Sequence, residues 1–351
     1  MKLGCYYFNW CRAGKWASIK RYAGADLRPV LGWYDDKKPE VHDWQIKQAT
    51  RHGIKFWVFD WYFDVAKDTP YGYKNAMLDK GFLNSKLNGE MEFSVMWCNE
   101  ERDFTAYEPR HLTTLIELWG ELYFSRPNYL RTPDGRNIIL MTRPDRLIDT
   151  FGYEGTKDAI NAMREAALPW GGLFFATIKY PTPEELSLLV RAGFDACTLY
   201  SYMNEGMKPG ENSGPYEEIL KTVEPIWRSG AESGLLPIIP LVSPNWDSRP
   251  WAGLGGRGSW RTDPTPEKFE DMCRALKRYV DPYLGLVLIG TWNEFGEGSH
   301  IEPTVPLGCS YLDAAQRGFF PEEYKPHELL CPSPEEKKKL IYKKIPADGQ
   351  P

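Results

Sequence analysis

The stretch "GLVLIGTWNEF" (residues 285–295) passes directly from an apolar run into a polar and aromatic cluster. The run places Leu, Val and Ile side by side, without the alternation of apolar and polar residues that a half-exposed strand shows. Strands of a parallel sheet that is covered on both faces have this pattern. The stretch therefore predicts a buried parallel strand followed by a loop rich in chemically active side chains.

Seven further segments repeat this pattern. They are "KLGCYYF" (2–8), "IKFWVFDWYF" (54–63), "EFSVMWCN" (92–99), "RNIILMTRP" (136–144), "LFFATIKY" (173–180), "DACTLYSYM" (195–203) and "LPIIPLVSPNW" (236–246). Helical patterns lie between them, at 41–53, 111–124, 156–168, 182–193, 216–230 and 265–280. Several begin with Thr, Pro and Glu and several end on Gly, which are typical residues of helix termini. Eight strands alternating with helices predict a single-domain α/β fold, the (β/α)8 TIM barrel.

A doubly wound open sheet is the main alternative fold. Such sheets bind dinucleotides at a GxGxxG motif placed between a strand and a helix. The match here, Gly253, Gly255 and Gly258, lies in a loop well after the seventh strand, and "SWRTDPTP" separates it from the next helix. No nucleotide cofactor is therefore expected. We assign residues 1–324 to the barrel and the charged, proline-containing residues 325–351 to a short C-terminal surface extension.

Composition restricts the class of partner. With 351 residues and 42% hydrophobic content, the chain can bury a sizeable core. The net charge of -5 arises from well-mixed acids and bases, so no basic surface for nucleic acid or an anionic membrane is expected. The seven cysteines are scattered without a CxxC motif, which indicates neither a disulfide framework nor a zinc ribbon.

The N-terminal segment "MKLGCYYFNW" enters a strand-like pattern at once, without an apolar run long enough for a signal sequence or a membrane helix. Two locations stay open on this basis. The protein is cytoplasmic, or it is periplasmic or extracellular if an export signal was removed. The oligomeric state is not indicated.

In such a barrel the active site lies at the C-terminal ends of the strands. The residues there that we expect to contact a substrate are Tyr6, Tyr7, Trp10, Asp60, Trp61, Tyr62, Trp97, Asn99, Lys179, Tyr202, Trp246, Asp247, Trp292 and Asn293. Glu100, Arg143, Tyr180 and Tyr200 also stand at strand ends. Aromatic rings stack on the C–H faces of sugars, and sugar hydroxyls need charged or polar partners. The set predicts a carbohydrate pocket, since a phosphate or DNA site would contain more Arg and Lys.

Glu294 and Glu297 are the sharpest candidates for catalysis. Three residues apart on a turn after the last strand, they can point into one cavity. Repulsion between the carboxylates then leaves one proton on the pair and separates their pKa values, so that one group is a base and the other an acid. The alternative is that they cap the following segment or pair with surface cations.

Three more residues belong to this set of candidates. Asp60 lies among aromatic neighbours, where a carboxylate is costly to bury, so it is either functional or part of a structural ion pair. His300 stands at the expected pocket mouth, and Glu302 falls later in the same loop; both are expected substrate contacts. A metal site formed by His300, Glu297 and Glu302 has no HxxxH or HExxH spacing in its favour, so neither a metal nor a cofactor is expected.

Several segments resemble the WbsX-like proteins, which are related to the endo-α-mannosidases of glycoside hydrolase family 99. These segments are "GCYYFNW" (4–10), "LRPVLGWYDDKKPEVHDWQIKQATRHGIKFWVFDWYF" (27–63), "SPNWDSRP" (243–250) and "WNEFGEGSHIEPTVPLGCSYLDA" (292–314). The resemblance extends from residue 3 to about residue 316, and the last segment is the most specific. It implies a (β/α)8 barrel, as the strand pattern does.

The resemblance also implies a mechanism. Glu294 would be the general base and Glu297 the general acid of a retaining hydrolysis. The base removes the proton from the 2-hydroxyl of the sugar, whose oxygen attacks C1 and forms a 1,2-anhydro intermediate that water opens. This route differs from the usual carboxylate nucleophile. Because the 2-oxygen must lie anti to the leaving group, it restricts substrates to 1,2-trans glycosides such as α-mannosides or α-rhamnosides.

The resemblance leaves two points open. WbsX-branch proteins also bear the label of glycosyltransferases of polysaccharide gene clusters, although no nucleotide-sugar fingerprint occurs here. Asp247 and Arg249 stand where a mannosidase would place its own substrate contacts, so Arg249 joins the expected contacts and the sugar stays undetermined. We expect a glycoside hydrolase of a polysaccharide or complex glycan; the alternatives are a glycosyltransferase of O-antigen-type synthesis and a glycan-binding barrel without catalysis.

Overall fold

A computed structural model describes residues 1–10, 12–23, 27–64, 67, 69–70, 72–99, 108–252 and 258–345. Its centre is one eight-stranded sheet with only parallel pairs, in the order β10-β12-β1-β2-β5-β6-β7-β8. The strands are β1 (Lys2–Tyr7), β2 (Ile54–Trp61), β5 (Glu92–Trp97), β6 (Asn137–Met141), β7 (Leu173–Ile178), β8 (Ala196–Thr198), β10 (Leu241–Val242) and β12 (Leu286–Ile289). A parallel bridge from Cys197 to Ile238 joins β8 to the segment before β10 and brings the two ends of the sheet together.

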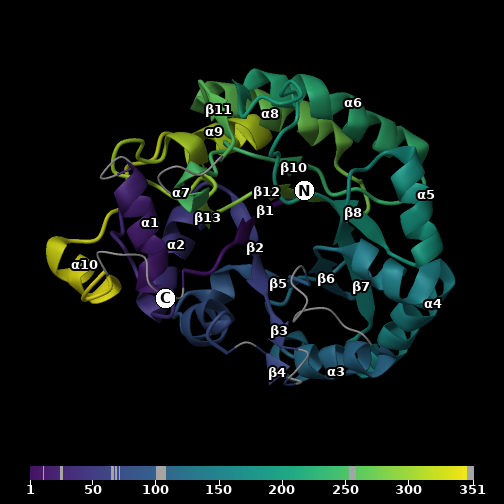
Figure 1. Ribbon diagram of the computed structural model, residues 1–351. Coiled ribbons are helices and arrows are strands. Elements are labelled where there is room, and N and C mark those ends of the chain that lie inside the picture. Colours follow the sequence, from purple (N-terminus) through teal and green to yellow (C-terminus); the bar gives the residue numbers. More distant parts are fainter. Residues whose placement is uncertain are drawn as a thin grey trace.

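Helices surround this sheet, as Figure 1 shows in a view that has the strands in the middle. They are α1 (Ala13–Ala23), α2 (Pro39–Arg51), α3 (Pro109–Trp119), α4 (Pro144–Ala166), α5 (Pro183–Ala192), α6 (Glu217–Ser233), α7 (Arg249–Ala252), α8 (Pro266–Leu276), α9 (Ser310–Phe319) and α10 (Pro334–Leu340). Short two-stranded pairs complete the described elements: β3 (Phe63–Asp64) with β4 (Thr69–Pro70), β9 (Ser213–Pro215) with β11 (Trp260–Thr262), and β13 (Asn293–Glu294) with β14 (Ser299–His300).

The predicted (β/α)8 barrel is confirmed, because each of the eight predicted runs contains one barrel strand. The expected N-caps are present where Thr182 and Thr265 accept a hydrogen bond from the third helical residue. The sequence patterns missed α1, α7, α9 and α10, and α4 begins earlier than the pattern at 156–168. Its first half precedes a kink at Gly152, whose φ of 69° lies outside the helical region.

Side chains alternate along the strands between the barrel interior and the helices. The largest aromatic side chains fill the layer under the helices. Trp61 and Trp97 both contact Trp119 of α3, with ring centroids 5.4 and 6.4 Å away. Tyr202 accepts a hydrogen bond of 2.6 Å from Trp227 of α6. Large aromatic residues at strand ends therefore stabilise the wall of the barrel.

A second apolar cluster lies beside the barrel mouth. Its buried members are Trp10, Trp16, Ile19, Val30, Leu31, Tyr34, Val41, Phe295 and Leu340. The C-terminal segment closes it: Leu340 is buried, the Tyr342 hydroxyl donates to the backbone of Trp10 at 2.9 Å, and Tyr34 forms a bridge with Ile341. In Figure 1 this segment, with the yellow α10, lies near the purple α1. Residues 340–342 thus contact the N-terminal part of the chain at the mouth of the barrel.

Some sequence features fall on parts of the chain that the structure does not describe. Cys11, Glu100, Gly253 and Gly255 lie outside the described residues, as do positions 346–351. Among the described residues, no helix is long and apolar enough to cross a membrane.

Candidate active site

Glu294 and Glu297 stand on a hairpin that extends the last barrel strand. β13 pairs antiparallel with β14, with Glu294 opposite Ser299. Thr291, at the base, holds both sides: its backbone N–H donates to the Ser299 carbonyl at 2.6 Å, and its hydroxyl accepts from the Glu294 N–H at 2.8 Å. The Trp292 N–H donates to the carbonyl of Tyr6 at 2.7 Å and so joins the hairpin to β1. The two glutamates are therefore carried by backbone that is hydrogen-bonded on both sides.

Two glycines in this turn are required by close contacts. A Cβ at Gly296 would lie 1.9 Å from the Trp251 ring. Gly298 has a φ of +63°, and a Cβ there would lie 2.9 Å from the Cβ of Asp247. The sequence "EFGEG" thus allows the hairpin to approach the 246–252 segment closely enough for a direct contact with Glu294.

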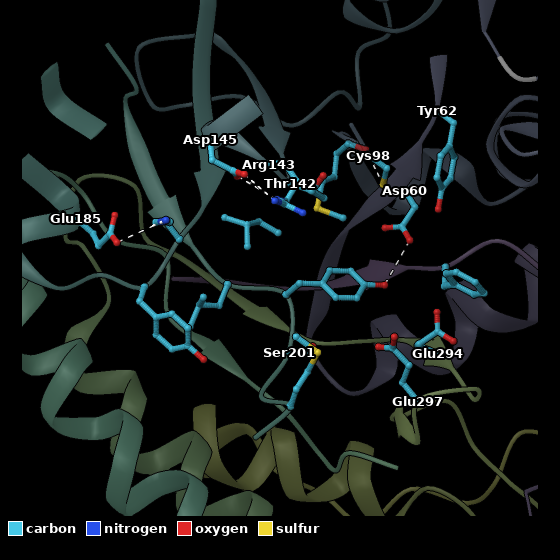
Figure 2. A pocket seen from close by; sticks show the side chains of 18 residues that line it. Asp60, Tyr62, Cys98, Thr142, Arg143, Asp145, Glu185, Ser201, Glu294 and Glu297 are labelled. Carbon is cyan, nitrogen blue, oxygen red and sulfur yellow. Dashed lines mark hydrogen bonds and ion pairs between the residues drawn. The ribbon is translucent and has the colours of Figure 1, made fainter. Parts of the chain in front are cut away.

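Both glutamates line a cavity of about 680 Å³ at the C-terminal ends of the strands. Figure 2 shows the 18 side chains around it. They are Phe8, Asp60, Tyr62, Met96, Cys98, Thr142, Arg143, Asp145, Ile178, Lys179, Tyr180, Glu185, Leu199, Tyr200, Ser201, Met203, Glu294 and Glu297. A cavity of this volume is in the usual range for small-molecule sites.

Three carboxyl groups gather at one end of this cavity. The sheet order places β12, β1 and β2 side by side, so that the hairpin after β12 and Asp60 at the end of β2 lie on neighbouring walls. Figure 2 shows Asp60, Glu294 and Glu297 on the same side of the pocket. The Tyr200 hydroxyl donates to Asp60 at 3.4 Å, and the Trp251 indole N–H donates to Glu294 at 3.2 Å.

Burial raises the pKa of the Glu294 carboxyl well above its usual 4.5, and the nearby charge of Glu297 raises it further. Lys15 lowers the pKa, Asp60 raises it, and the hydrogen bond from Trp251 lowers it. The Glu297 side chain is only half-buried. Unequal environments of this kind divide two close carboxyl groups into an acid and a base.

The opposite end of the cavity carries two ion pairs. Arg143 donates to both carboxylate oxygens of Asp145, at 3.0 and 2.6 Å, and the Lys179 ammonium lies 3.5 Å from Glu185. Figure 2 shows Asp145 and Glu185 across the pocket from Glu294. With five carboxyl groups and two cations in its lining, the cavity carries an excess of negative charge.

Five residues that the sequence predicted for the site line this cavity. They are Asp60, Tyr62, Lys179, Glu294 and Glu297. Strand-end side chains therefore surround the glutamate pair, as expected. Most of them are not the residues that the sequence analysis predicted as substrate contacts. The remaining predicted contacts do not line the cavity, and each has a partner elsewhere in the fold.

Tyr6 and Tyr7 are fully buried beneath the site. The Tyr6 ring lies 4.9 Å from that of Tyr200 and supports it from the barrel interior. Tyr7 points outward to α2, where its hydroxyl donates to Gln45 at 2.8 Å. Trp61, Trp97 and Tyr202 face the helices, as described above.

Trp10, Trp292 and Asn293 hold the hairpin of Glu294 and Glu297 against β1. The Trp10 indole N–H donates to the Asn293 carbonyl at 2.7 Å. The Asn293 amide bonds both backbone groups of Phe8, accepting at 2.8 Å and donating at 3.0 Å. Trp292 is fully buried, with its ring 5.5 Å from that of Trp57. All three predicted contacts therefore position the site from behind.

Four more predicted residues contact protein groups beside the cavity. Asn99 accepts from the Arg143 N–H at 2.8 Å and donates to its carbonyl at 3.0 Å, which fixes Arg143 at the pocket wall. Asp247 and Arg249 form a two-pronged ion pair, with distances of 2.8 and 2.7 Å. Trp246 is buried in the same segment.

His300 and Glu302 line a second cavity of about 160 Å³ instead. His300 stacks on Phe295 with centroids 4.1 Å apart, and burial lowers the pKa of its imidazole to about 3. Glu302 accepts hydrogen bonds from the Tyr34 hydroxyl at 2.7 Å and the Gln45 amide at 2.9 Å. Burial raises the pKa of Glu302 to about 8 despite these bonds.

The two-residue periodicity of side chains along a strand would have identified some of the lining residues that the sequence analysis did not predict. Residues two apart share a face of a strand. The pocket contains Met96 and Cys98, whereas Trp97 between them does not line it. Asp60 is paired in register with Met96, so extending its parity to the next strand would have favoured Met96 and Cys98 over Trp97. The rule is incomplete on later strands, since Lys179 and Tyr200 line the pocket together with the residues on both sides of them. Glu185, which is contributed by α5, has no such signal.

No group of three or more His, Cys, Asp or Glu side chains that could hold a metal ion occurs in the described part of the chain. The six cysteines with described positions are all free thiols, and five of them are buried.

Several known proteins are similar to this chain in sequence or in fold. The family model described as "Glycosyltransferase WbsX" matches residues 26–315. Protein WxcX of Xanthomonas campestris pv. campestris (strain B100), itself uncharacterized, is 24% identical over 342 residues, which cover 86% of this chain and 44% of that protein. The glycoprotein endo-alpha-1,2-mannosidase of Mus musculus is 21% identical over 324 residues, covering 87% and 61% of the two chains. This chain therefore spans less than half of the first relative and about three fifths of the second.

Among solved structures, the GH99 endo-alpha-mannosidase from Bacteroides thetaiotaomicron superimposes with a TM-score of 0.61 at 18% identity. The match covers 92% of this chain and 96% of that one. The shared fold is the (β/α)8 barrel derived above. By the match over residues 26–315, the chain belongs to the WbsX family, and it is related to glycoside hydrolase family 99.

Proposed function

We propose that this protein is a retaining glycoside hydrolase that cleaves 1,2-trans glycosidic bonds of a polysaccharide or complex glycan. The observation that carries the proposal is the pair Glu294 and Glu297, which line one cavity from a single hydrogen-bonded hairpin. Paired carboxyl groups in different environments are the usual equipment of glycosidases. Family membership and the endo-alpha-mannosidases among the relatives support the same reaction class.

In the first step, Glu294 takes the proton of the 2-hydroxyl while O2 attacks C1. The bond from C1 to the leaving oxygen breaks, and that oxygen receives its proton from Glu297. In the second step, water attacks C1 and gives its proton to Glu297, while O2 departs from C1 and recovers its proton from Glu294. Two inversions at C1 leave the anomeric configuration unchanged, and both carboxyl groups return to their first protonation states.

The environment of Glu294 suits a base near neutral pH, and the reaction also requires that the proton shared by the pair lie on Glu297 when the substrate binds. A general base works best when its pKa lies near the working pH. Burial and the neighbouring acids raise the pKa of Glu294 toward that range. Glu297 is half-buried and lines the cavity, where a leaving group can reach it. Release of reducing ends from a panel of defined 1,2-trans oligosaccharides tests the proposal; inactivity across the whole panel would contradict it.

The pH profile offers a direct test of the base. Glu294 acts only when ionised, so kcat/KM should be lost as the pH falls through its raised pKa, above pH 4.5. In Glu297→Gln the neighbouring negative charge is gone, and the acidic limb should move to lower pH. An activated aryl glycoside allows the measurement in both proteins. A limb that stays in place, or that moves upward, would contradict the assignment of Glu294.

The family description keeps a glycosyltransferase as the second candidate. Its donor would be a nucleotide sugar with two negative phosphates. The cavity offers five carboxyl groups, and its two cations already face Asp145 and Glu185. We therefore expect no calorimetric binding of UDP- or GDP-sugars at millimolar concentration, with a neutral methyl glycoside as the control. Tight nucleotide-sugar binding would favour the transferase and contradict the hydrolase.

A further inference from the structure

A band of side chains without nitrogen or oxygen lines the cavity beyond the carboxyl groups. It consists of Met96, Cys98, Ile178, Leu199 and Met203, and is called the apolar band below. Met96 lies on β5 directly beside Asp60 of β2, to which it is paired in register. Ile178 ends β7, and Leu199 follows β8. Met96 and Cys98 of the band therefore lie next to the acidic end of the cavity. Ile178 and Leu199 lie beyond β6, which contributes Thr142 and Arg143 to the lining.

The apolar band extends from the floor of the cavity to its rim. Met96 and Leu199 expose only 1% and 5% of their surface, whereas Met203 exposes 50%. Ile178 is half-buried. A ligand that reaches the glutamates thus passes over apolar side chains at several depths. Such a lining is unexpected for a site whose ligand carries a hydroxyl on nearly every carbon.

The proposed chemistry places the sugar ring relative to this band. Glu294 must reach O2, and Glu297 must reach the glycosidic oxygen on C1. The opposite edge of a pyranose ring, formed by C4 and C5, then points away from these carboxyl groups and toward the rest of the cavity. In a hexose such as mannose, C5 carries a hydroxymethyl group; in a 6-deoxyhexose it carries a methyl group.

The apolar band distinguishes these two substituents. A hydroxyl pressed against it loses its hydrogen bonds to water, and thioether and thiol sulfur atoms are only weak replacements. A methyl group gains by leaving water and packs well against methionine. We propose that the enzyme selects a 6-deoxyhexose, of rhamnose type, whose methyl group lies on the apolar band. This inference rests on the proposed hydrolase function.

Matched pairs of glycosides that differ only at C6 test the inference. Aryl α-L-rhamnosides are compared with α-L-mannosides, and 6-deoxy-α-D-mannosides with α-D-mannosides, each as mono- and disaccharides. We expect kcat/KM to favour the deoxy member of one pair by about 10- to 100-fold, the usual discrimination of an apolar pocket. Equal rates for the two members of each pair, or a preference for the hydroxymethyl sugar, would overturn the inference.

Substitutions in the apolar band test whether it causes the preference for the 6-deoxy sugar. Met203→Gln and Ile178→Thr each add a hydrogen-bonding group at little change in size, and should reduce the preference by about 3- to 10-fold. Met203 is the safer position, since its exposed side chain contributes little to folding. Leu168→Gln is the matched control, because Leu168 is 70% exposed and does not line the cavity. An unchanged preference in both band variants would contradict the assignment.

Thio-linked versions of the same pairs separate this inference from the proposed function. They bind without being hydrolysed, so their affinities report the C6 preference alone. Tighter binding of the deoxy thioglycosides without turnover of the oxygen glycosides would keep the band assignment and reject the hydrolase. Hydrolysis of both members of each pair at equal rates would keep the hydrolase and reject the band assignment.

Discussion

Glu297→Gln should lower the rate of hydrolysis of a natural glycan by about 10²- to 10⁴-fold, the usual contribution of general acid catalysis. Glutamine keeps the shape and hydrogen-bonding reach of the side chain but cannot donate the proton that an alkoxide leaving group needs. An activated aryl leaving group departs without that proton, so its release should be much less affected. Rates measured on both substrate types separate loss of the acid from general damage to the site.

Glu294→Gln should impair both substrate types, because the 2-hydroxyl must be activated whatever group departs. The melting temperature of the variant separates this loss from unfolding. Burial disfavours the ionised Glu294 carboxyl, as its raised pKa indicates, so a neutral amide should not lower the melting temperature near neutral pH. Glu232→Gln on the exposed surface of α6 is the matched control. Near wild-type rates in both active-site variants on the natural glycan would make the pair structural.

The barrel could be predicted from the sequence because its strands are buried on both faces. Runs such as "LVLI" (286–289) and "NIILM" (137–141) are typical of parallel strands covered on both faces, and the alternation of eight of them with helices favoured the barrel. The glutamate pair could be predicted for a related reason, since the last strand must end at the barrel mouth and the pair follows it closely. Both inferences use short-range information together with a general rule of the fold.

The rest of the cavity depends on which face of each strand points inward. Trp97 and its neighbour Met96 are equally plausible as sequence letters, yet only Met96 lines the cavity, because Trp97 fills the space under α3. Contacts between distant segments left no sequence signal at all. The bond from Trp251 to Glu294 depends on the close approach permitted by Gly296, and no spacing rule indicates it.

Glu302 is a predicted substrate contact that the tertiary structure places elsewhere. Its place in the segment "SHIEP" (299–303) made it a reasonable substrate contact. Its carboxyl group instead accepts hydrogen bonds from Tyr34 and Gln45, two residues more than 250 positions away in the chain. Acidic residues in one short loop can therefore serve different purposes, and only the tertiary structure separates them.

A substrate analogue without a 2-hydroxyl should bind to the protein and not turn over. If Glu294 is a base that acts on O2, a 2-deoxy or 2-fluoro glycoside cannot form the 1,2-anhydro ring, and hydrolysis should fall below detection. An enzyme that uses a carboxylate nucleophile behaves differently with an activated 2-fluoro glycoside. It accumulates a glycosyl ester, because the fluorine slows the breakdown of that intermediate.

Intact-protein mass spectrometry after incubation separates the two mechanisms. We expect an unchanged protein mass together with competitive inhibition of the natural reaction. The inhibition is essential, since it shows that the analogue occupied the cavity beside Glu294 and Glu297. A mass increase of one fluorinated sugar, mapped to either glutamate, would instead assign a nucleophile to the site. That result would reject the 1,2-anhydro intermediate while leaving the glycoside hydrolase in place, because both routes use the same pair of carboxyl groups.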